Sequence, residues 1–347
     1  MTVLALETSC DDTCAAVVEA SGEIRSNVIS SQAAHERFGG VVPEIASRHH
    51  LELVNVIIEE ALSRADASLD DIELVAATQG PGLVGALLVG LSTAKALAAA
   101  RELPFAAVDH LQGHVAANFL IGDGGGTPFE PPFLCLIASG GHTLLARVMA
   151  HDGFEVIGRA LDDAAGEAFD KGARMLGLGY PGGAALERLA RGGDPEAFSF
   201  PGSAAERARG GRGPRRKAYA ESLDFSFAGL KTALLYTLRE LTDVECETRA
   251  ADLAASYQAA IVDSLVLRSE RALERTGLGR LAVGGGVAAN GELRRRLGEL
   301  DASVHIPPPA LCTDNAAMIA SAARHGRHLS YPEYLGLDAY ATGEHAR

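Results

Sequence analysis

Apolar, strand-like segments that run into glycine-rich turns and then into helices occur in both halves of this chain. In the first half, the apolar run 72–78 leads through a Gly-Pro-Gly turn at 80–82 into a long apolar helix. In the second half, the run 280–283 leads through three glycines into a helix near 290–297. Strands that alternate with helices in this way are typical of an α/β fold.

A series of short strands precedes this pattern in each half. The strand-like runs are 2–7, 15–19 and 24–30 in the first half, and 133–138, 143–148 and 154–157 in the second. Two halves with the same order of elements indicate an internal duplication. Duplicated α/β halves meet at a cleft, and we expect ligands to bind there, where strands end and helices begin.

Glycine-rich turns also predict the chemistry of the ligand. They occur at 79–82, 139–142 and 284–286. Backbone N–H groups in such turns, near the positive end of a helix dipole, bind anions, so three turns of this kind point to a phosphate-bearing ligand. Their sequences match neither the P-loop nor the dinucleotide-binding fingerprint, which disfavours a P-loop kinase and an NAD-dependent dehydrogenase.

Two histidines four residues apart, His110 and His114, suggest a metal site. On a helix their Cβ atoms would lie about 5–6 Å apart on one face, although an exposed helix face has the same spacing. The zinc-protease pattern has a Glu beside the first histidine as general base, whereas Leu111 and Gln112 follow here. A metal at this site would therefore orient or polarise a ligand rather than activate water. Asp314, before an apolar helix, is a candidate ligand or helix N-cap.

The composition limits the kinds of protein that this chain can be. With 47% hydrophobic and 22% charged residues in 347, we expect a soluble protein of two domains. Five scattered cysteines and an N-terminus without the features of a signal peptide favour a cytoplasmic protein with no membrane span. The net charge of −14 disfavours binding of nucleic acid, unless a local basic patch or a partner protein contacts the phosphates. The basic segment 202–219 is either a solvated loop or an RNA-contacting arm.

A series of motifs, in order along the chain, resembles the bacterial TsaD family, once labelled O-sialoglycoprotein endopeptidase. They lie at 6–11, 39–44, 80–85, 110–114, 139–143, 162–171, 180–183, 224–227, 229–232 and 312–315. The resemblance implies the α/β fold of the actin-like ATPase superfamily, with two ribonuclease-H-like domains around a central cleft. The implied domains are 1–115 with 314–340, and 130–313, with a basic loop at 202–219 and a tail at 341–347.

The resemblance also implies an activity and its site residues. Members of the family transfer a threonylcarbamoyl group from threonylcarbamoyl-AMP to N6 of the adenosine 3′ of the anticodon in tRNA. His110, His114 and Asp314 would hold one divalent metal ion, iron in the bacterial members, with zinc as the alternative. The residues implied to bind the adenylate are Ile137, Ala138, Ser139, Gly140, Gly141, Asp170, Gly183 and Asn290. Three residues depart from those usual in the family, namely Asp12, Glu187 and Ala288.

Acyl transfer to an adenosine amine also needs a proton acceptor, and Asp11 is our hypothesis for that role. The resemblance implies a TsaB-type dimerisation partner and a TsaE-type ATPase, which would help an acidic chain to bind tRNA. Two other classes of function stay open at this point. They are a metallopeptidase, which Leu111 and Gln112 disfavour, and an actin-like small-molecule kinase or nucleotide-driven binding module.

Overall fold

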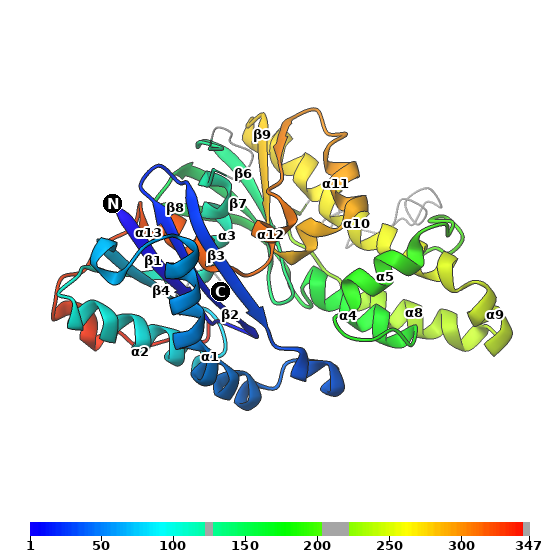
Figure 1. Cartoon of the computed structure of the whole chain (residues 1–347). Helices are drawn as coiled ribbons and strands as arrows, with labels where there is room; N and C mark the ends of the chain where they lie inside the picture. Colours follow the sequence, from blue (N-terminus) through cyan, green and yellow to red (C-terminus); the bar gives the residue numbers. More distant parts are fainter. Residues whose placement is uncertain (122–127, 203–221, 343–347) are drawn as a thin grey trace. The chain divides into compact units, whose positions relative to one another are not determined.

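The computed structural model describes residues 1–121, 128–202 and 222–342 (Figure 1). Two compact units share these residues. Unit 1 comprises Met1–Pro131, Val148–Phe154 and Pro307–Arg347, and unit 2 comprises Pro132–Arg147 and Glu155–Ile306. The basic loop expected at 202–219 lies outside the described residues apart from Gly202, as does the tail 341–347 beyond Thr342.

Unit 1 contains a five-stranded sheet in the order β3-β2-β1-β4-β5. Its strands are β1 (Thr2–Glu7), β2 (Asp12–Glu19), β3 (Ile24–Ser31), β4 (Leu74–Gly80) and β5 (Phe105–Asp109). β2 pairs antiparallel with β1 and β3, which confirms the expected meander, whereas β4 pairs parallel with β1 and β5. Because β1, β4 and β5 are parallel, their carboxyl ends meet at one edge of the sheet.

Helices pack against this sheet. The α-helices are α1 (Pro43–Arg64), α2 (Val84–Ala100), α3 (His110–Ala116), α12 (Pro309–Cys312) and α13 (Ala316–Ala323). The 3-10 helices are η1 (Ala33–Phe38), η2 (Leu69–Asp71), η3 (Ala117–Phe119) and η5 (Glu333–Gly336). α1 contacts β2 and α2 contacts β4, while α13 contacts β1, β2 and α3.

Strand parity determines which side chains of β1 face α13. Successive side chains of a strand point to opposite faces. Leu4 and Leu6 pack into a core with residues of α1 and α2. Val3, Ala5 and Glu7 therefore point to the other face, where α13 contacts β1. All five are buried, as expected for a sheet covered on both faces, so Glu7 is a buried carboxylate at the end of an apolar strand.

Unit 2 contains a second five-stranded sheet in the order β10-β9-β6-β7-β8. Its strands are β6 (Phe133–Ala138), β7 (Thr143–Ala150), β8 (Gly153–Arg159), β9 (Arg280–Gly284) and β10 (Ser303–His305). Read from its other edge, this order repeats that of unit 1, and β9 pairs parallel with β6 and β10 just as β4 does with β1 and β5. The repeated topology confirms the expected duplication.

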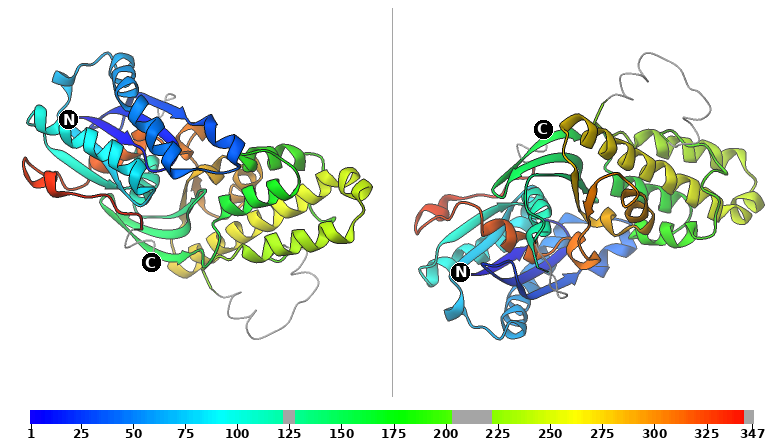
Figure 2. Two further views of the ribbon diagram at one scale, coloured as in Figure 1. Left: turned by 90° about the horizontal axis from the view of Figure 1, so that it is seen from below. Right: turned by 90° about the horizontal axis from the view of Figure 1, so that it is seen from above.

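The helices of unit 2 are coloured green to orange in Figure 2, and the longest of them contacts all the other α-helices of the unit. They are α4 (Ala165–Met175), α5 (Gly182–Ala190), α8 (Ala228–Glu240), α9 (Asp243–Thr248), α10 (Ala250–Thr276), α11 (Gly291–Leu297) and the 3-10 helix η4 (Gly286–Ala289). Among the described residues, α10 is the one helix long and apolar enough to cross a membrane. Because 72% of its most apolar window is buried in the protein, α10 has the environment of a core helix.

Candidate metal centre

Helix α3 begins directly at the edge of the sheet in unit 1. The side chain of Asp109, the last residue of β5, accepts hydrogen bonds from the backbone N–H groups of Leu111 (2.9 Å) and Gln112 (3.2 Å). This N-cap fixes the start of the helix at His110, since it satisfies N–H groups that have no partner within the helix. His110 and His114 therefore lie one turn apart on a short buried helix.

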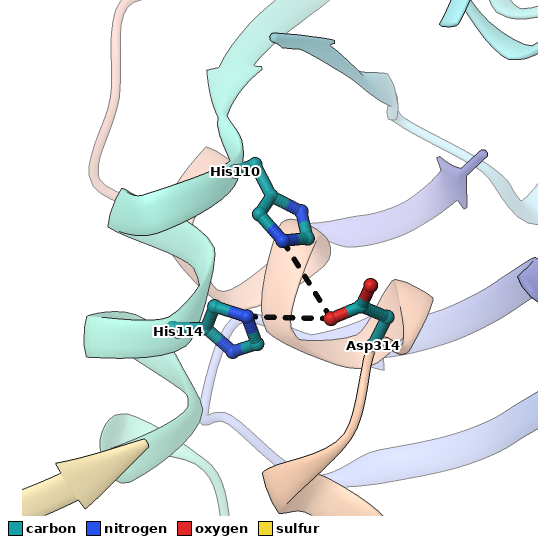
Figure 3. Close-up of side chains that lie close together, drawn as sticks. All are labelled: His110, His114 and Asp314. Atoms are coloured by element: carbon teal, nitrogen blue, oxygen red, sulfur yellow. Dashed lines mark ion pairs between the residues drawn. The ribbon is translucent and has the colours of Figure 1, made fainter. Parts of the chain in front are cut away.

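Asp314 lies beside the histidine pair (Figure 3). Its Oδ1 is 3.6 Å from His110 Nε2 and 3.3 Å from His114 Nε2. One ligand atom from each of the three residues lies within 4.8 Å of the others. Asp314 does not cap α13, because Asn315 does so by accepting from the N–H of Met318 (3.0 Å). The structure thus brings the three expected ligands together and assigns the cap to the neighbouring residue.

His114 tests whether this group suits a metal. The side chain is fully buried, yet neither ring nitrogen has a hydrogen-bond partner among the described residues. A buried polar atom without a partner costs about 1–3 kcal/mol. The Nε2 atom faces Asp314 Oδ1 at 3.3 Å without hydrogen-bond geometry, and a cation bound by both atoms would satisfy it. Two imidazoles and one carboxylate are a common donor set for transition metals.

Behind His110 lies the buried carboxylate of Glu7. Its Oε2 is 3.0 Å from His110 Nδ1 and accepts from Thr78 Oγ1 (2.6 Å), while its Oε1 accepts from the backbone N–H of Ser9. Burial alone would raise the pKa of Glu7, but the charge and hydrogen bond of His110 hold it below its ordinary value. Burial lowers the pKa of His110, and the charges of Asp314 and Glu7 outweigh this and raise it to about 9.

The segment that carries Asp11 is held by another buried histidine, His50 on α1. Its Nε2 donates to the carbonyl of Cys10 (3.0 Å), and its Nδ1 accepts from Thr13 Oγ1 (2.8 Å). Burial lowers the pKa of His50, which favours this neutral form. The backbone carbonyl of Asp11 accepts from the N–H of Gln32 (3.2 Å). Sequence reasoning missed both His50 and Glu7, although a carboxylate at the end of an apolar strand was a feature it could have used.

Two neighbours of Asp11 have perturbed protonation. Burial, together with the charge of Asp314, raises the pKa of Asp12 to about 7 despite a hydrogen bond from Ser31. Cys14 is buried, and its thiol donates to the backbone carbonyl of Asp314 (3.7 Å). Burial raises the pKa of this thiol well above its ordinary value, which keeps it neutral. Cys14 therefore acts as a small buried residue that contacts the Asp314 backbone.

The residues expected to bind the adenylate lie in unit 2. Ile137 and Ala138 end β6, and Ser139 closes the following turn, where its Oγ accepts from the N–H of His142 (3.1 Å). A Cβ at Gly140 or Gly141 would meet no atom within 4 Å, so there is open space beside these two glycines.

The remaining expected residues, Asp170, Gly183 and Asn290, lie in or directly before the helices α4, α5 and α11. The N–H of Gly166, in the first turn of α4, donates to the carbonyl of Ser139 (3.1 Å). Asp170 Oδ1 accepts from the N–H of Gly182 (2.9 Å), directly before Gly183, at the start of α5. Asn290 caps α11 by accepting from Leu293 N (3.0 Å). Its amide also donates to Gln258 Oε1 (2.9 Å). Their role as adenylate ligands stays a prediction.

Comparison with known proteins decides the family. Residues 23–321 match the family model described as TsaD: tRNA N6-adenosine threonylcarbamoyltransferase. The chain belongs to the TsaD family. A relative from Trichlorobacter lovleyi with the same description is 48% identical, over 99% of this chain and 96% of its own length. A relative from Symbiobacterium thermophilum is 49% identical over 96% of both chains. The expected family membership is confirmed.

Solved structures show the fold of this TsaD-family chain. Component A of the Acidaminococcus fermentans (R)-2-hydroxyglutaryl-CoA dehydratase covers 96% of this chain and 99% of its own, with a TM-score of 0.55 at 16% identity. The HypF protein of T. kodakarensis covers 92% of this chain, and 47% of its own, with a TM-score of 0.58 at 13% identity. At these identities the likeness concerns the fold alone. It confirms the expected α/β fold.

Proposed function

We propose that this chain transfers the threonylcarbamoyl group from threonylcarbamoyl-AMP to N6 of the adenosine 3′ of the anticodon, in tRNAs that read codons beginning with adenine, and releases AMP. The observation that carries the proposal is the convergence of His110, His114 and Asp314 in a buried group. It occurs in a chain that is 48% identical, over 99% of its length, to a relative named for this transfer.

His110, His114 and Asp314 would hold one divalent metal ion. A set of two histidines and one carboxylate leaves coordination positions open, as in non-haem iron(II) sites, so we assign iron, with zinc as the alternative. When bound, the ion supplies a Lewis acid that polarises a carbonyl or phosphoryl oxygen and neutralises developing charge.

The chain's own groups bind and orient the adenylate. The proposed phosphate-binding residues are Ile137 and Ala138 at the end of β6 and Ser139, Gly140 and Gly141 in the turn that follows. Support comes from the open space beside Gly140 and Gly141, where a phosphate can approach the backbone closely. Asp170, Gly183 and Asn290 complete the proposed binding residues. In the transfer, the adenosine amine attacks the carbamoyl carbonyl, a new C–N bond forms, and the C–O bond to AMP breaks with its electron pair. Because AMP is a good leaving group, most of the rate acceleration should come from positioning the adenosine amine against the carbamoyl carbonyl.

Asp11 is the proposed acceptor of the proton that the adenosine amine loses. Its backbone is fixed by the bond from Gln32, and the preceding carbonyl is fixed by His50, which supports a positioned side chain. An Asp11→Asn variant would keep the shape and lose the base. Full transfer by this variant would refute the assignment.

The acidic charge of the chain bears on how tRNA is bound. At a net charge of −14, this chain should hold tRNA weakly by itself. We propose a cytoplasmic complex with a TsaB-type dimerisation partner and a TsaE-type ATPase. Tight binding of tRNA by the isolated chain would contradict the need for partners.

A reconstituted transfer reaction tests the proposal. The mixture contains the chain, its partners, the adenylate-forming enzyme, tRNA, labelled threonine, bicarbonate and ATP. We expect label in the RNA, and no label with the His110→Ala variant. A peptidase is less well supported, because Leu111 occupies the place of the general base and the amide of Gln112 donates to the His151 carbonyl (3.0 Å). A kinase would need only loosely held magnesium, so firmly bound metal lost in His114→Ala argues against it.

A further inference from the structure

We propose that Glu7 is the positioning residue of the metal centre, which holds His110 in the one tautomer that can bind a metal through Nε2. The inference rests on the metal site proposed above and assigns a role to a residue outside the three ligands. It comes from the buried contact between Glu7 Oε2 and His110 Nδ1, 3.0 Å apart, on the opposite side of the imidazole from Asp314.

The sheet of unit 1 brings these groups together. β1 and β4 are parallel, with Leu6 beside Ala77, so the next residues, Glu7 and Thr78, lie at the carboxyl ends of adjacent strands. β5 is next in the sheet, and His110 follows its last residue directly. The parity of β1 points Glu7 to the face covered by α13. The contact between Glu7 and His110 therefore follows from the order of the strands in the sheet and does not depend on the conformation of a long loop.

The carboxylate of Glu7 determines which nitrogen of His110 carries the proton. A carboxylate can only accept hydrogen bonds. When a metal displaces the Nε2 proton of His110, the proton that remains must therefore lie on Nδ1, which faces Glu7 Oε2. The Nε2 lone pair is then free to bind a metal on the side of Asp314, 3.6 Å away. Metal-ligating histidines characteristically donate their other N–H to such a carboxylate, which fixes the ring and raises its basicity.

Ser9 is the competing partner of His110, since its Oγ lies 3.2 Å from Nδ1. A hydroxyl can donate or accept, so Ser9 alone would leave the tautomer undetermined. The carboxylate decides it, because it is closer and has no proton to give. Glu7 is itself fixed, since Oε1 accepts from the N–H of Ser9 and Oε2 accepts from Thr78 Oγ1 (2.6 Å).

The Glu7→Gln variant tests this arrangement. The N–H of Ser9 faces one oxygen of Glu7, and Thr78 Oγ1 and His110 Nδ1 face the other. The NH2 group of a glutamine would therefore have to point at a hydrogen-bond donor on one side or the other. Directed at His110, the NH2 group would move the imidazole proton to Nε2 and block the metal. We expect Co²⁺, titrated into the metal-free chain and followed by its visible absorption, to bind roughly 10–100-fold more weakly than to wild type.

A matched control separates positioning from simple loss of packing. Thr8 is also buried, and its hydroxyl donates to the carbonyl of Ala86 (2.9 Å). Thr8→Val should lower the thermal stability of the metal-free chain and leave the Kd for Co²⁺ unchanged. Glu7→Gln with a wild-type Kd would overturn the proposal. So would an equal loss of affinity in Thr8→Val.

Wild-type protein gives a second test that does not depend on how well Glu7→Gln folds. In the histidine-labelled chain loaded with Zn²⁺, a proton–nitrogen correlation spectrum should show His110 protonated on Nδ1. Protonation on Nε2 would overturn the proposal. Neither measurement uses tRNA or the partners. A wild-type chain that binds metal and fails to transfer the threonylcarbamoyl group would therefore contradict the proposed function and leave the role of Glu7 standing.

Discussion

Replacing His114 by alanine should separate a metal ligand from an ordinary core histidine. Truncating a fully buried side chain leaves a cavity and typically costs about 2–5 kcal/mol. In the metal-free chain, the same change removes two ring nitrogens that lack partners among the described residues, which relieves about 1–3 kcal/mol for each. The relief offsets most of the cavity cost, so we expect the free energy of unfolding of the metal-free chain to fall by less than about 2 kcal/mol.

The metal-bound chain should respond differently. A ligand at one hundred times its Kd stabilises the folded state by about 2.7 kcal/mol. Urea titrations with and without Co²⁺ should show this gain in wild type and no gain in His114→Ala. His50→Ala is the matched control, because His50 is also buried but both its nitrogens have partners. It should lose more stability without metal and keep the gain from Co²⁺. An equal gain from Co²⁺ in His114→Ala would refute the reasoning.

Three further predictions concern stability. Gly172→Ala should destabilise unit 2 by about 1–3 kcal/mol in urea titrations, since the added Cβ would overlap the buried ring of Tyr257, and an unchanged midpoint would contradict this packing. Asn315→Ala should lower the free energy of unfolding by about 1 kcal/mol, because α13 loses its N-cap. An unchanged free energy of unfolding would show that the cap does not stabilise the protein. Burial and the charge of Arg324 lower the pKa of His325 to about 4. The unfolded chain takes up this proton near pH 6.5, so it binds more protons than the folded chain between about pH 6.5 and 4, and stability falls as pH falls through that window. His325→Gln should flatten this part of the stability curve, and an unchanged slope would show that other groups cause it.

Strands were predictable where the chain is apolar and bounded by turn residues. β1 and β6 coincide with the runs 2–7 and 133–138. β2 begins at Asp12 rather than at 15, because Asp12, Thr13 and Cys14 extend the pairing with β3 through residues that look like a polar turn in the sequence. Cross-strand pairing depends on the partner strand, which local composition does not contain.

The metal centre was predictable only in part from the residues themselves. Helical spacing placed His110 and His114 together, and the N-cap at Asp109 explains why the helix begins there. The sequence offered Asp314 as a candidate ligand or N-cap. Only the family resemblance favoured its role as a ligand, because no local pattern connects it with a pair so distant in sequence. Asp314 and Asn315 are both good capping residues, so the cap could not be assigned without the fold. The position of Glu7 depends on strand order and parity together.

The central claim is that His110, His114 and Asp314 hold a metal that the transfer of the threonylcarbamoyl group requires. The most direct test measures labelled threonine in tRNA with chelator-treated chain, before and after addition of Fe²⁺, in the presence of the partners. We expect no transfer by the metal-depleted chain, recovery on adding Fe²⁺ to wild type, and no recovery in Asp314→Ala. Full transfer by the metal-depleted wild-type chain would contradict the central claim.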